Sequence, residues 1–375
     1  MDKRLILKDI LPSKHPEKLG MLIGFDGFID EIMHPVDKRT DAQTFKRIET
    51  IEKFASRISK ASGLSTNIEL YPVNKKIGGN GPIMANALAQ SGASITYIGA
   101  MGYPTIDDVF KAMPDNVKIH SVADAGHTDA LEFHDGKLLM GKMASLSEVT
   151  YERIIETLGE ETFTRLLSKT DLFATVNWSM LPFMTDLWKK MIRHILKDLP
   201  EQKTKPVMFI DLADPEKREN EEIIEALNLL KGFESRFRVI LGLNKKEAYD
   251  TANVLGLFDP ELLESMELPL KDLAFGLHTH LGIHGVVIHP VERSCAVLDG
   301  VYAEELGPYV KEPKLTTGAG DNFNAGFALG VLLGLDVDQA LLLGMSTSGF
   351  YVRNARSPLF SELPGFIEAW ASGLI

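Results

Sequence analysis

The chain has 375 residues, of which 45% are hydrophobic and 25% are charged, as is usual for a soluble globular protein. Its net charge of -12 disfavours a nucleic-acid or anionic-membrane surface, although a local pocket can still be positive. Cys295 is the only cysteine, which excludes an intramolecular disulfide. No segment resembles a signal peptide, and the longest apolar run, 325–335, is too short to span a bilayer. We therefore expect a cytoplasmic protein that binds neither nucleic acid nor membrane.

Short apolar runs alternate with longer segments of helical periodicity along most of the chain. The candidate strands are 19–27, 93–102, 171–178, 205–213, 237–244, 285–290 and 294–299. Segments 147–170 and 215–233 are typical of helices. Most of the strands are apolar throughout, which indicates burial on both faces of a largely parallel sheet. The alternation predicts an α/β fold, a doubly wound α/β/α sandwich with a mostly parallel central sheet.

Two regions depart from this alternation and predict a small β-rich lid. Residues 130–143 read as two short strands around Asp135-Gly136, a strong hairpin signal. Residues 40–62 are charged and helix-like, and residues 66–77 then become strand-like. We expect a single domain over 1–375, with lid segments inserted at about 31–77 and 128–143. The sequence does not assign a role to the helical part at about 41–62.

The stretch TTGAGDNFNAGF, residues 316–327, predicts an anion site. A glycine-rich turn before a helix presents free N–H groups and a partial positive charge, which suits phosphate. It lacks the lysine of a P-loop, and Phe323 stands where a dinucleotide-binding motif needs glycine.

Asp321 falls in the first turn of the predicted helix. There the helix dipole favours the ionised carboxylate, which makes it a weak base. Phosphoryl transfer tolerates a weak base, because its transition state is loose. The alternative on these residues alone is a helix-capping aspartate beside a tight turn.

Three motifs together resemble the ribokinase-like (PfkB) carbohydrate kinase family. Residues 316–327 resemble its C-terminal signature, and residues 77–102 resemble its N-terminal glycine-rich signature. Between them, Asn244-x-x-Glu247 is similar to the family's N-x-x-E motif at a strand end. The motifs occur in the family's order, and the resemblance covers roughly residues 19–355.

The resemblance implies roles on the nucleotide side of the site. Asp321 would be the catalytic base, and the amide of Asp321 would join an anion hole for the transferring phosphoryl. That anion hole would consist of Gly318, Ala319 and Gly320, and the nucleotide and Mg²⁺ would be held by Asn244, Glu247 and Thr317. Glu247 would reach the metal through water. The spacing of Asn244 and Glu247 equally fits a helix N-cap with a capping box, and both interpretations can hold together.

The resemblance assigns fewer residues to the sugar-binding side of the site. The resemblance implies that an aspartate near the end of the first strand binds substrate hydroxyls. Both Asp30 and Asp26 are available, and the spacing from the strand glycine favours Asp30. Gly78, Gly79 and Asn80 match the paired-glycine region that admits the substrate.

Two departures from the family pattern are relevant to the ligands. Ile83 stands where the family usually has asparagine, so the sugar contacts are rearranged. Leu315 stands where relatives that bind a monovalent cation often have aspartate, which makes such a cation doubtful here.

The resemblance implies an ATP-dependent phosphotransferase that phosphorylates a primary hydroxyl of a sugar or sugar derivative, with Mg²⁺ on the ATP. The alternatives are a nucleoside kinase of the same family and a non-catalytic sugar- or nucleotide-binding regulator on the same fold. The sequence names neither the sugar nor the oligomeric state, although an exposed lid edge would favour a homodimer.

Overall fold

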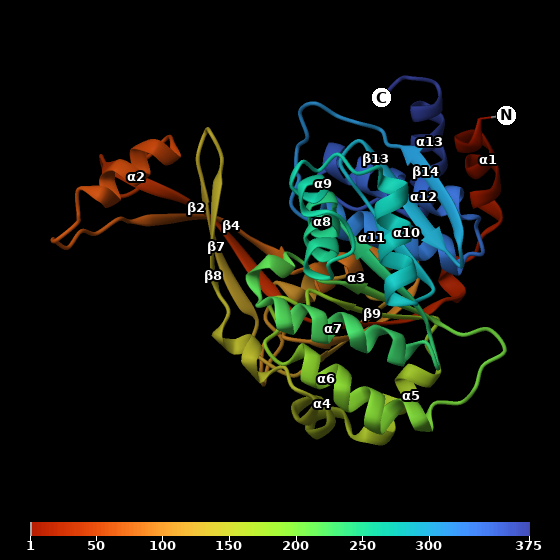
Figure 1. Cartoon of the computed structure of the whole chain (residues 1–375). Helices are drawn as coiled ribbons and strands as arrows, with labels where there is room; N and C mark the ends of the chain where they lie inside the picture. The colour runs from red at the N-terminus through yellow and green to blue at the C-terminus, as the bar shows by residue number, and fades with distance from the viewer. Residues whose placement is uncertain (1) are drawn as a thin grey trace.

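The central element of the protein is a nine-stranded sheet (Figure 1). The computed structural model describes residues 2–375. The strand order is β14-β13-β12-β11-β10-β9-β1-β5-β6. In chain order these strands are β1 (Gly20–Phe25), β5 (Ser94–Gly99), β6 (Val117–Ser121), β9 (Leu172–Val176), β10 (Val207–Asp211), β11 (Arg238–Leu243), β12 (Gly285–Ile288), β13 (Arg293–Leu298) and β14 (Val301–Leu306).

The sheet is parallel from β6 to β12, and β13 and β14 add to it in antiparallel orientation. This confirms the predicted mostly parallel sheet, and all seven predicted strands are present. The prediction missed β6 and β14. Both are edge strands with partly exposed side chains, so neither shows the continuous apolar run of a strand that is buried on both faces.

Helices cover both faces of the sheet (Figure 1). One layer consists of α1 (Lys3–Ile10), α3 (Asn80–Gln90), α11 (Ala319–Leu332), α12 (Val337–Asn354) and α13 (Leu363–Ala371). The other consists of α4 (Tyr151–Leu158), α5 (Glu160–Ser168), α6 (Met184–Lys190), α7 (Asn220–Phe233), α8 (Lys245–Val254), α9 (Pro260–Glu264) and α10 (Leu270–Leu281). The predicted helix at 147–170 is divided into α4 and α5, because Gly159 has a φ of 80°. This arrangement confirms the sandwich.

Each helical layer has its own hydrophobic core. Successive side chains of a buried strand point to opposite faces, so one strand contributes to both cores. On β9, Phe173 packs into the core beside α4–α10, whereas Leu172 and Ala174 pack into the core beside α3 and α11. The α3 and α11 core fixes the first turns of these two helices against the sheet.

A second, five-stranded sheet extends from one side of the sandwich (Figure 1). It consists of β2 (Phe28–Arg39), β3 (Phe45–Arg47), β4 (Leu70–Gly78), β7 (Gly126–Glu132) and β8 (Lys137–Lys142). Strand β2 pairs with β4 and with β7, and β7 and β8 form the hairpin predicted around Asp135-Gly136. This sheet is called the lid below.

The helix predicted from residue 40 begins later than expected. The Asp41 carboxylate accepts hydrogen bonds from the Gln43 and Thr44 N–H groups, and this local turn stops a helix from forming there. Helix α2 covers only Ile51–Ser59. Its Phe54 packs on Phe133, with ring centroids 5.4 Å apart, so α2 closes a small hydrophobic core on the lid.

No helix within residues 2–375 is long and apolar enough to cross a membrane.

Candidate active site

Five polar residues follow or end five neighbouring parallel strands. They are Asp26 after β1, Asn177 after β9, Asp211 on β10, Asn244 after β11 and His289 after β12. Because the carboxyl ends of parallel strands meet at one edge of a sheet, these residues lie along that edge, and the crevice outside it is where α/β proteins bind ligands. Sequence reasoning did not assign Asp211 or His289 to the site. The available signal was a polar residue at the end of an apolar strand.

Helix α11 points its N-terminus into this crevice. Gly318 caps the helix with a φ of 90°, a backbone conformation that favours glycine. The Ala319 N–H bonds the Thr316 carbonyl at 3.0 Å. The N–H groups of Gly320 and Asp321 have no partner within residues 2–375, so these are the two donors that the turn offers an anion.

Asp321 is a buried carboxylate in the first turn of α11. Asn80 at the start of α3 donates from Nδ2 to Asp321 Oδ1 at 2.9 Å. Burial raises the pKa of Asp321 well above its usual value, and the charges of Asp211, Asp26 and Glu247 raise it further. The expectation that the helix dipole makes Asp321 a weak base is therefore wrong, because desolvation and like charges outweigh the dipole.

Asp26 holds the turn of residues 79–81 at the start of α3. Its carboxylate is fully buried and accepts hydrogen bonds from Asn80 N–H, Gly81 N–H and Asn177 Nδ2, at 2.9, 2.9 and 2.7 Å. Burial raises the pKa of Asp26 to about 6, although these hydrogen bonds lower it. A Cβ on Gly79, which has a φ of 91°, would lie 2.8 Å from Asp26 Oδ2. Only glycine fits there.

Asp30 lies on β2 of the lid and is half-buried. Burial raises the pKa of Asp30, whereas Lys76 and the Thr128 hydroxyl lower it. A Cβ on Gly78 would overlap the Asp30 carboxylate, so this glycine makes room for it. Burial raises the pKa of Tyr351, and the charges of Asp321 and Asp30 raise it further, so both carboxylates lie within electrostatic range of its hydroxyl.

Asn244 and Glu247 form the predicted capping box at the start of α8. Asn244 Oδ1 accepts the Glu247 N–H, and Glu247 Oε2 accepts the Asn244 N–H, both at 2.9 Å. Glu247 Oε1 also accepts the Asp214 N–H at 2.9 Å. The Glu247 side chain is thereby fixed and buried in the crevice.

Asp211 lies next to Glu247 and is also buried. It accepts hydrogen bonds from the Ala213 N–H at 2.8 Å and from Asn324 Nδ2 at 2.6 Å. Burial and the charge of Glu247 raise the pKa of Asp211 to about 8. No lysine, arginine or histidine within residues 2–375 forms an ion pair with either carboxylate. Two adjacent buried carboxylates without a cationic partner suit a divalent cation. Such a cation would need further ligands from elsewhere, because no group of three or more metal-ligating side chains occurs among those residues.

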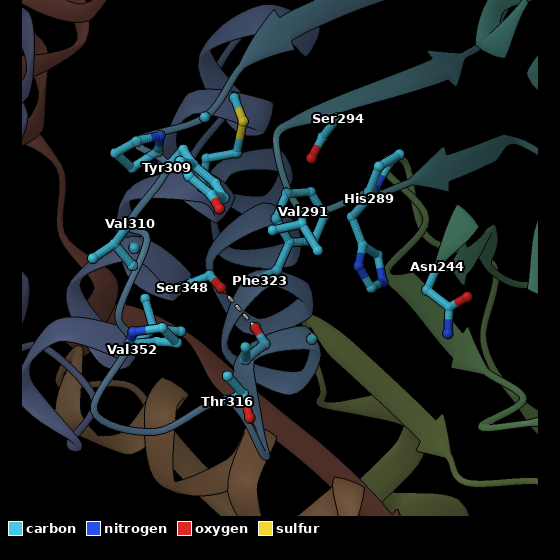
Figure 2. A pocket seen from close by; sticks show the side chains of 18 residues that line it. Asn244, His289, Val291, Ser294, Tyr309, Val310, Thr316, Phe323, Ser348 and Val352 are labelled. Atoms are coloured by element: carbon cyan, nitrogen blue, oxygen red, sulfur yellow. Dashed lines mark hydrogen bonds between the residues drawn. The ribbon is translucent and has the colours of Figure 1, made fainter. Parts of the chain in front are cut away.

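A cavity of about 380 Å³ lies beside the α11 turn (Figure 2). Its lining is mostly apolar, with a few polar side chains. The labelled lining residues are Asn244, His289, Val291, Ser294, Tyr309, Val310, Thr316, Phe323, Ser348 and Val352. Thr317 is not among these lining residues, and its carbonyl accepts a hydrogen bond from the Tyr351 hydroxyl at 2.8 Å. A mostly apolar lining with a few polar side chains fits a flat heteroaromatic group joined to a polar one.

Ile83 also contacts the α11 turn. Its Cγ2 and Cδ1 atoms lie 3.2 and 3.3 Å from the position that a Cβ on Gly318 would take. Ile83 and Leu315 line a separate hollow with Tyr351. An apolar wall therefore stands where the family usually offers an asparagine amide.

Comparisons with known proteins agree with this geometry. The family model described as prokaryotic ketohexokinase matches residues 7–370. The ketohexokinase of Haloferax volcanii is 26% identical over 363 residues, which are 95% of this chain and 93% of that protein.

Solved structures of the same fold are similar over nearly the whole chain. The ribokinase of Thermotoga maritima has a TM-score of 0.62 at 18% identity and covers 93% of this chain and 99% of its own. A phosphofructokinase-2 mutant of Escherichia coli has a TM-score of 0.63 at 14% identity, with 94% and 99% covered. The crevice, the three motifs and these matches lead to one conclusion: the chain belongs to the prokaryotic ketohexokinase family and is an ATP-dependent sugar kinase with the ribokinase fold.

Proposed function

We propose that this kinase transfers the γ-phosphoryl group of Mg·ATP to a primary hydroxyl of a ketohexose. The observation that carries the proposal is Asp321, a buried carboxylate with a raised pKa beside two unpartnered backbone N–H groups. The ketohexokinase of Haloferax volcanii supports the substrate class. Base and anion donors side by side are what a phosphoryl transfer to a hydroxyl requires.

The sugar would lie between Asp321, the 78–80 turn and Asp30. Asp321 would accept the proton of the attacking hydroxyl, and the N–H groups of Gly320 and Asp321 would stabilise charge on the moving phosphoryl. Asp30 would bind sugar hydroxyls, because its half-buried carboxylate lies against the 78–80 turn, where a Cβ on Gly78 would overlap it. Asp26 would act as a positioning residue, since its carboxylate is committed to the 79–81 turn.

The nucleotide would occupy the cavity beside α11, with its phosphates toward Gly320. Asp211 and Glu247 would hold Mg²⁺ directly or through water, since both are buried carboxylates without a cationic partner. When bound, Mg²⁺ screens the charge of the phosphates. We propose no monovalent cation, because Leu315 offers no carboxylate for one.

We also propose that the chain is one catalytic domain whose lid closes over the sugar and excludes water.

Two copies would pair through the lid, where Leu139 and Met140 of β8 are 62% and 53% exposed. Light scattering should then report a dimer for the wild type and a monomer for Leu139→Lys. Leu374→Lys, at a position near the C-terminus where the side chain is 78% exposed, should remain dimeric. A monomeric wild type at micromolar concentration contradicts this pairing.

Asn80→Ala should lower kcat by about tenfold and leave the KM for ATP nearly unchanged, because one hydrogen bond to a charged group is lost. The Asn80 hydrogen bond lowers the pKa of Asp321, so its removal raises that pKa. Activity needs the ionised carboxylate, and the acid limb of the kcat/KM profile should therefore move to higher pH.

Asn86→Ala is the matched control, because Asn86 lies on the same helix and outside the contacts of Asp321. It should reproduce the wild-type profile. An Asn80→Ala profile that coincides with wild type would show that Asn80 does not position the base.

The substrate class is tested by measuring ADP release from Mg·ATP with ketohexoses, aldohexoses, sugar acids and nucleosides. A ketohexose should give the highest kcat/KM. Preference for a nucleoside would favour the nucleoside-kinase alternative, and ATP binding without turnover on the whole panel would favour the non-catalytic regulator.

A further inference from the structure

Lys76 is a half-buried lysine on β4 of the lid, directly opposite Asp30 on β2. Residues that lie opposite each other in an antiparallel pair point to the same face of the sheet. Thr128 on β7 lies beside Asp30 on its other side. Burial raises the pKa of Asp30, whereas Lys76 and Thr128 both lower it, as expected for side chains gathered on one face. The lid therefore presents an ammonium group, a carboxylate and a hydroxyl in one row.

The ammonium group of Lys76 has no partner among residues 2–375. It forms neither a hydrogen bond nor an ion pair with them, and this includes Asp30. Two nearby cations differ in this respect, because Lys75 Nζ lies 3.4 Å from Asp107 Oδ2 and Arg356 Nη2 lies 2.6 Å from Glu362 Oε1. Lys76 is therefore the cation in this part of the lid that a ligand can engage without first breaking an ion pair.

Lys76 lines a hollow of about 460 Å³ together with Ile83 and Tyr351. This hollow reaches the catalytic turn: a Cβ on Gly318, which caps α11, would lie 2.9 Å from the Tyr351 hydroxyl and 3.2 Å from Ile83 Cγ2. None of the described residues that line the hollow is an aspartate or a glutamate. A group held beside Lys76 would thus lie between the lid and the turn that carries Asp321.

The residues assigned to the sugar so far are short of hydrogen-bond donors. A hydroxyl group both donates and accepts hydrogen bonds, whereas the ionised carboxylates of Asp30 and Asp321 can only accept them. Ile83 offers no polar atom, so this wall lacks an amide donor. Lys76 carries three N–H donors and no acceptor. Together with Asp30 it forms a net neutral pair of donor and acceptor, which suits an uncharged polyol.

We propose that Lys76 donates a hydrogen bond to the C3 or C4 hydroxyl of the bound ketohexose, while Asp30 accepts one from an adjacent hydroxyl. The inference rests on the proposed function and deepens it, because it names a residue that determines sugar specificity. A site built to bind a hydroxyl discriminates against an analogue that lacks it, since the polar groups of the site are then left unpaired. Lys76 takes no part in the transfer of the phosphoryl group.

Lys76→Met removes the ammonium group and keeps an unbranched apolar side chain of similar length. The KM for D-fructose should rise about tenfold or more, as for a lost hydrogen bond to a charged group, while kcat and the KM for ATP stay within about threefold of wild type. Lys75→Met is the matched control. Lys75 is the preceding residue of the same strand, so its side chain points to the opposite face, and it pairs with Asp107. This variant should keep the wild-type KM for D-fructose.

Analogues of D-fructose that lack the hydroxyl at C3 or at C4 separate direct contact from an effect that passes through Asp30. In the wild type, loss of the hydroxyl that Lys76 binds should lower kcat/KM about tenfold or more. In Lys76→Met, loss of the same hydroxyl should cost less than about threefold. A residue that only kept Asp30 ionised would leave the cost of each deoxygenation equal in the two proteins.

Either of two results would overturn the inference: an unchanged KM for D-fructose in Lys76→Met, or equal costs of deoxygenation in both proteins at both positions. The proposed function survives both of these results, because the wild type still phosphorylates D-fructose in them. A wild type that neither binds nor phosphorylates D-fructose would instead reject the proposed function, and this inference with it.

Discussion

Asp321→Asn should lower kcat by about 10² or more, the usual effect of removing a general base, and should leave ATP affinity within a few-fold of wild type. Asparagine has nearly the same shape as aspartate, and its Oδ1 can still accept the hydrogen bond from Asn80 that Asp321 accepts at 2.9 Å. The variant therefore removes the base and leaves the packing intact. Single-turnover and steady-state kinetics with the preferred sugar provide the measurement.

Asp336→Asn is the matched control, because Asp336 caps α12 at the surface and asparagine caps helices equally well. It should retain wild-type kcat. Substantial turnover in Asp321→Asn would assign the base to another residue.

Asp211→Asn should make the protein more stable when it is free of nucleotide and Mg²⁺. With substrates present, the variant should be less active than wild type. The folded-state pKa of Asp211 is about 8, against a usual value of 3.8, because burial and Glu247 disfavour its charge. A shift of this size corresponds to a cost on the order of a few kcal/mol once the carboxyl is ionised. The substitution removes that charge, and Asn324 can turn its amide so that its otherwise unpartnered Oδ1 accepts a hydrogen bond from the new amide.

The pH dependence of this effect has a definite sign. A raised folded-state pKa means that the contribution of Asp211 to stability is fully present below about pH 4 and is lost as the pH rises toward 8. The difference in unfolding temperature between Asp211→Asn and wild type should therefore be small at pH 5 and reach several degrees at pH 8. A variant that is less stable than wild type at pH 8 would contradict this account.

The kinetic counterpart is Mg²⁺ dependence. If Asp211 and Glu247 hold the metal, Asp211→Asn should require a higher Mg²⁺ concentration for half-maximal turnover, with little change in the KM for sugar. An unchanged Mg²⁺ requirement would remove Asp211 from the proposed metal site.

Local patterns predicted much of the fold. Continuous apolar runs identified the strands that are buried on both faces, because burial imposes the same composition on each of them. The edge strands β6 and β14 were not predicted, because half-exposed strands carry polar residues. The helix predicted from residue 40 failed because the Asp41 turn competes with it, and periodicity alone does not report such a turn.

The sequence indicated those members of the candidate site that share one short motif. Asp321 and the 318–320 turn are adjacent in sequence, and so are Asn244 and Glu247. Asp211 and His289 are isolated polar residues, and their significance lies in neighbours brought close only by the parallel sheet. The sequence also left Asp26 and Asp30 open, because the burial that distinguishes them depends on the 79–81 turn and the lid.

The most direct test of the central claim is ³¹P NMR of wild-type protein with Mg·ATP and D-fructose. We predict a new sugar monophosphate ester on a primary hydroxyl, formed in equal amount with ADP, and no such signal from Asp321→Asn. ADP formation without a sugar phosphate, or a phosphate ester that forms equally with Asp321→Asn, would contradict a ketohexose kinase that uses Asp321 as its base.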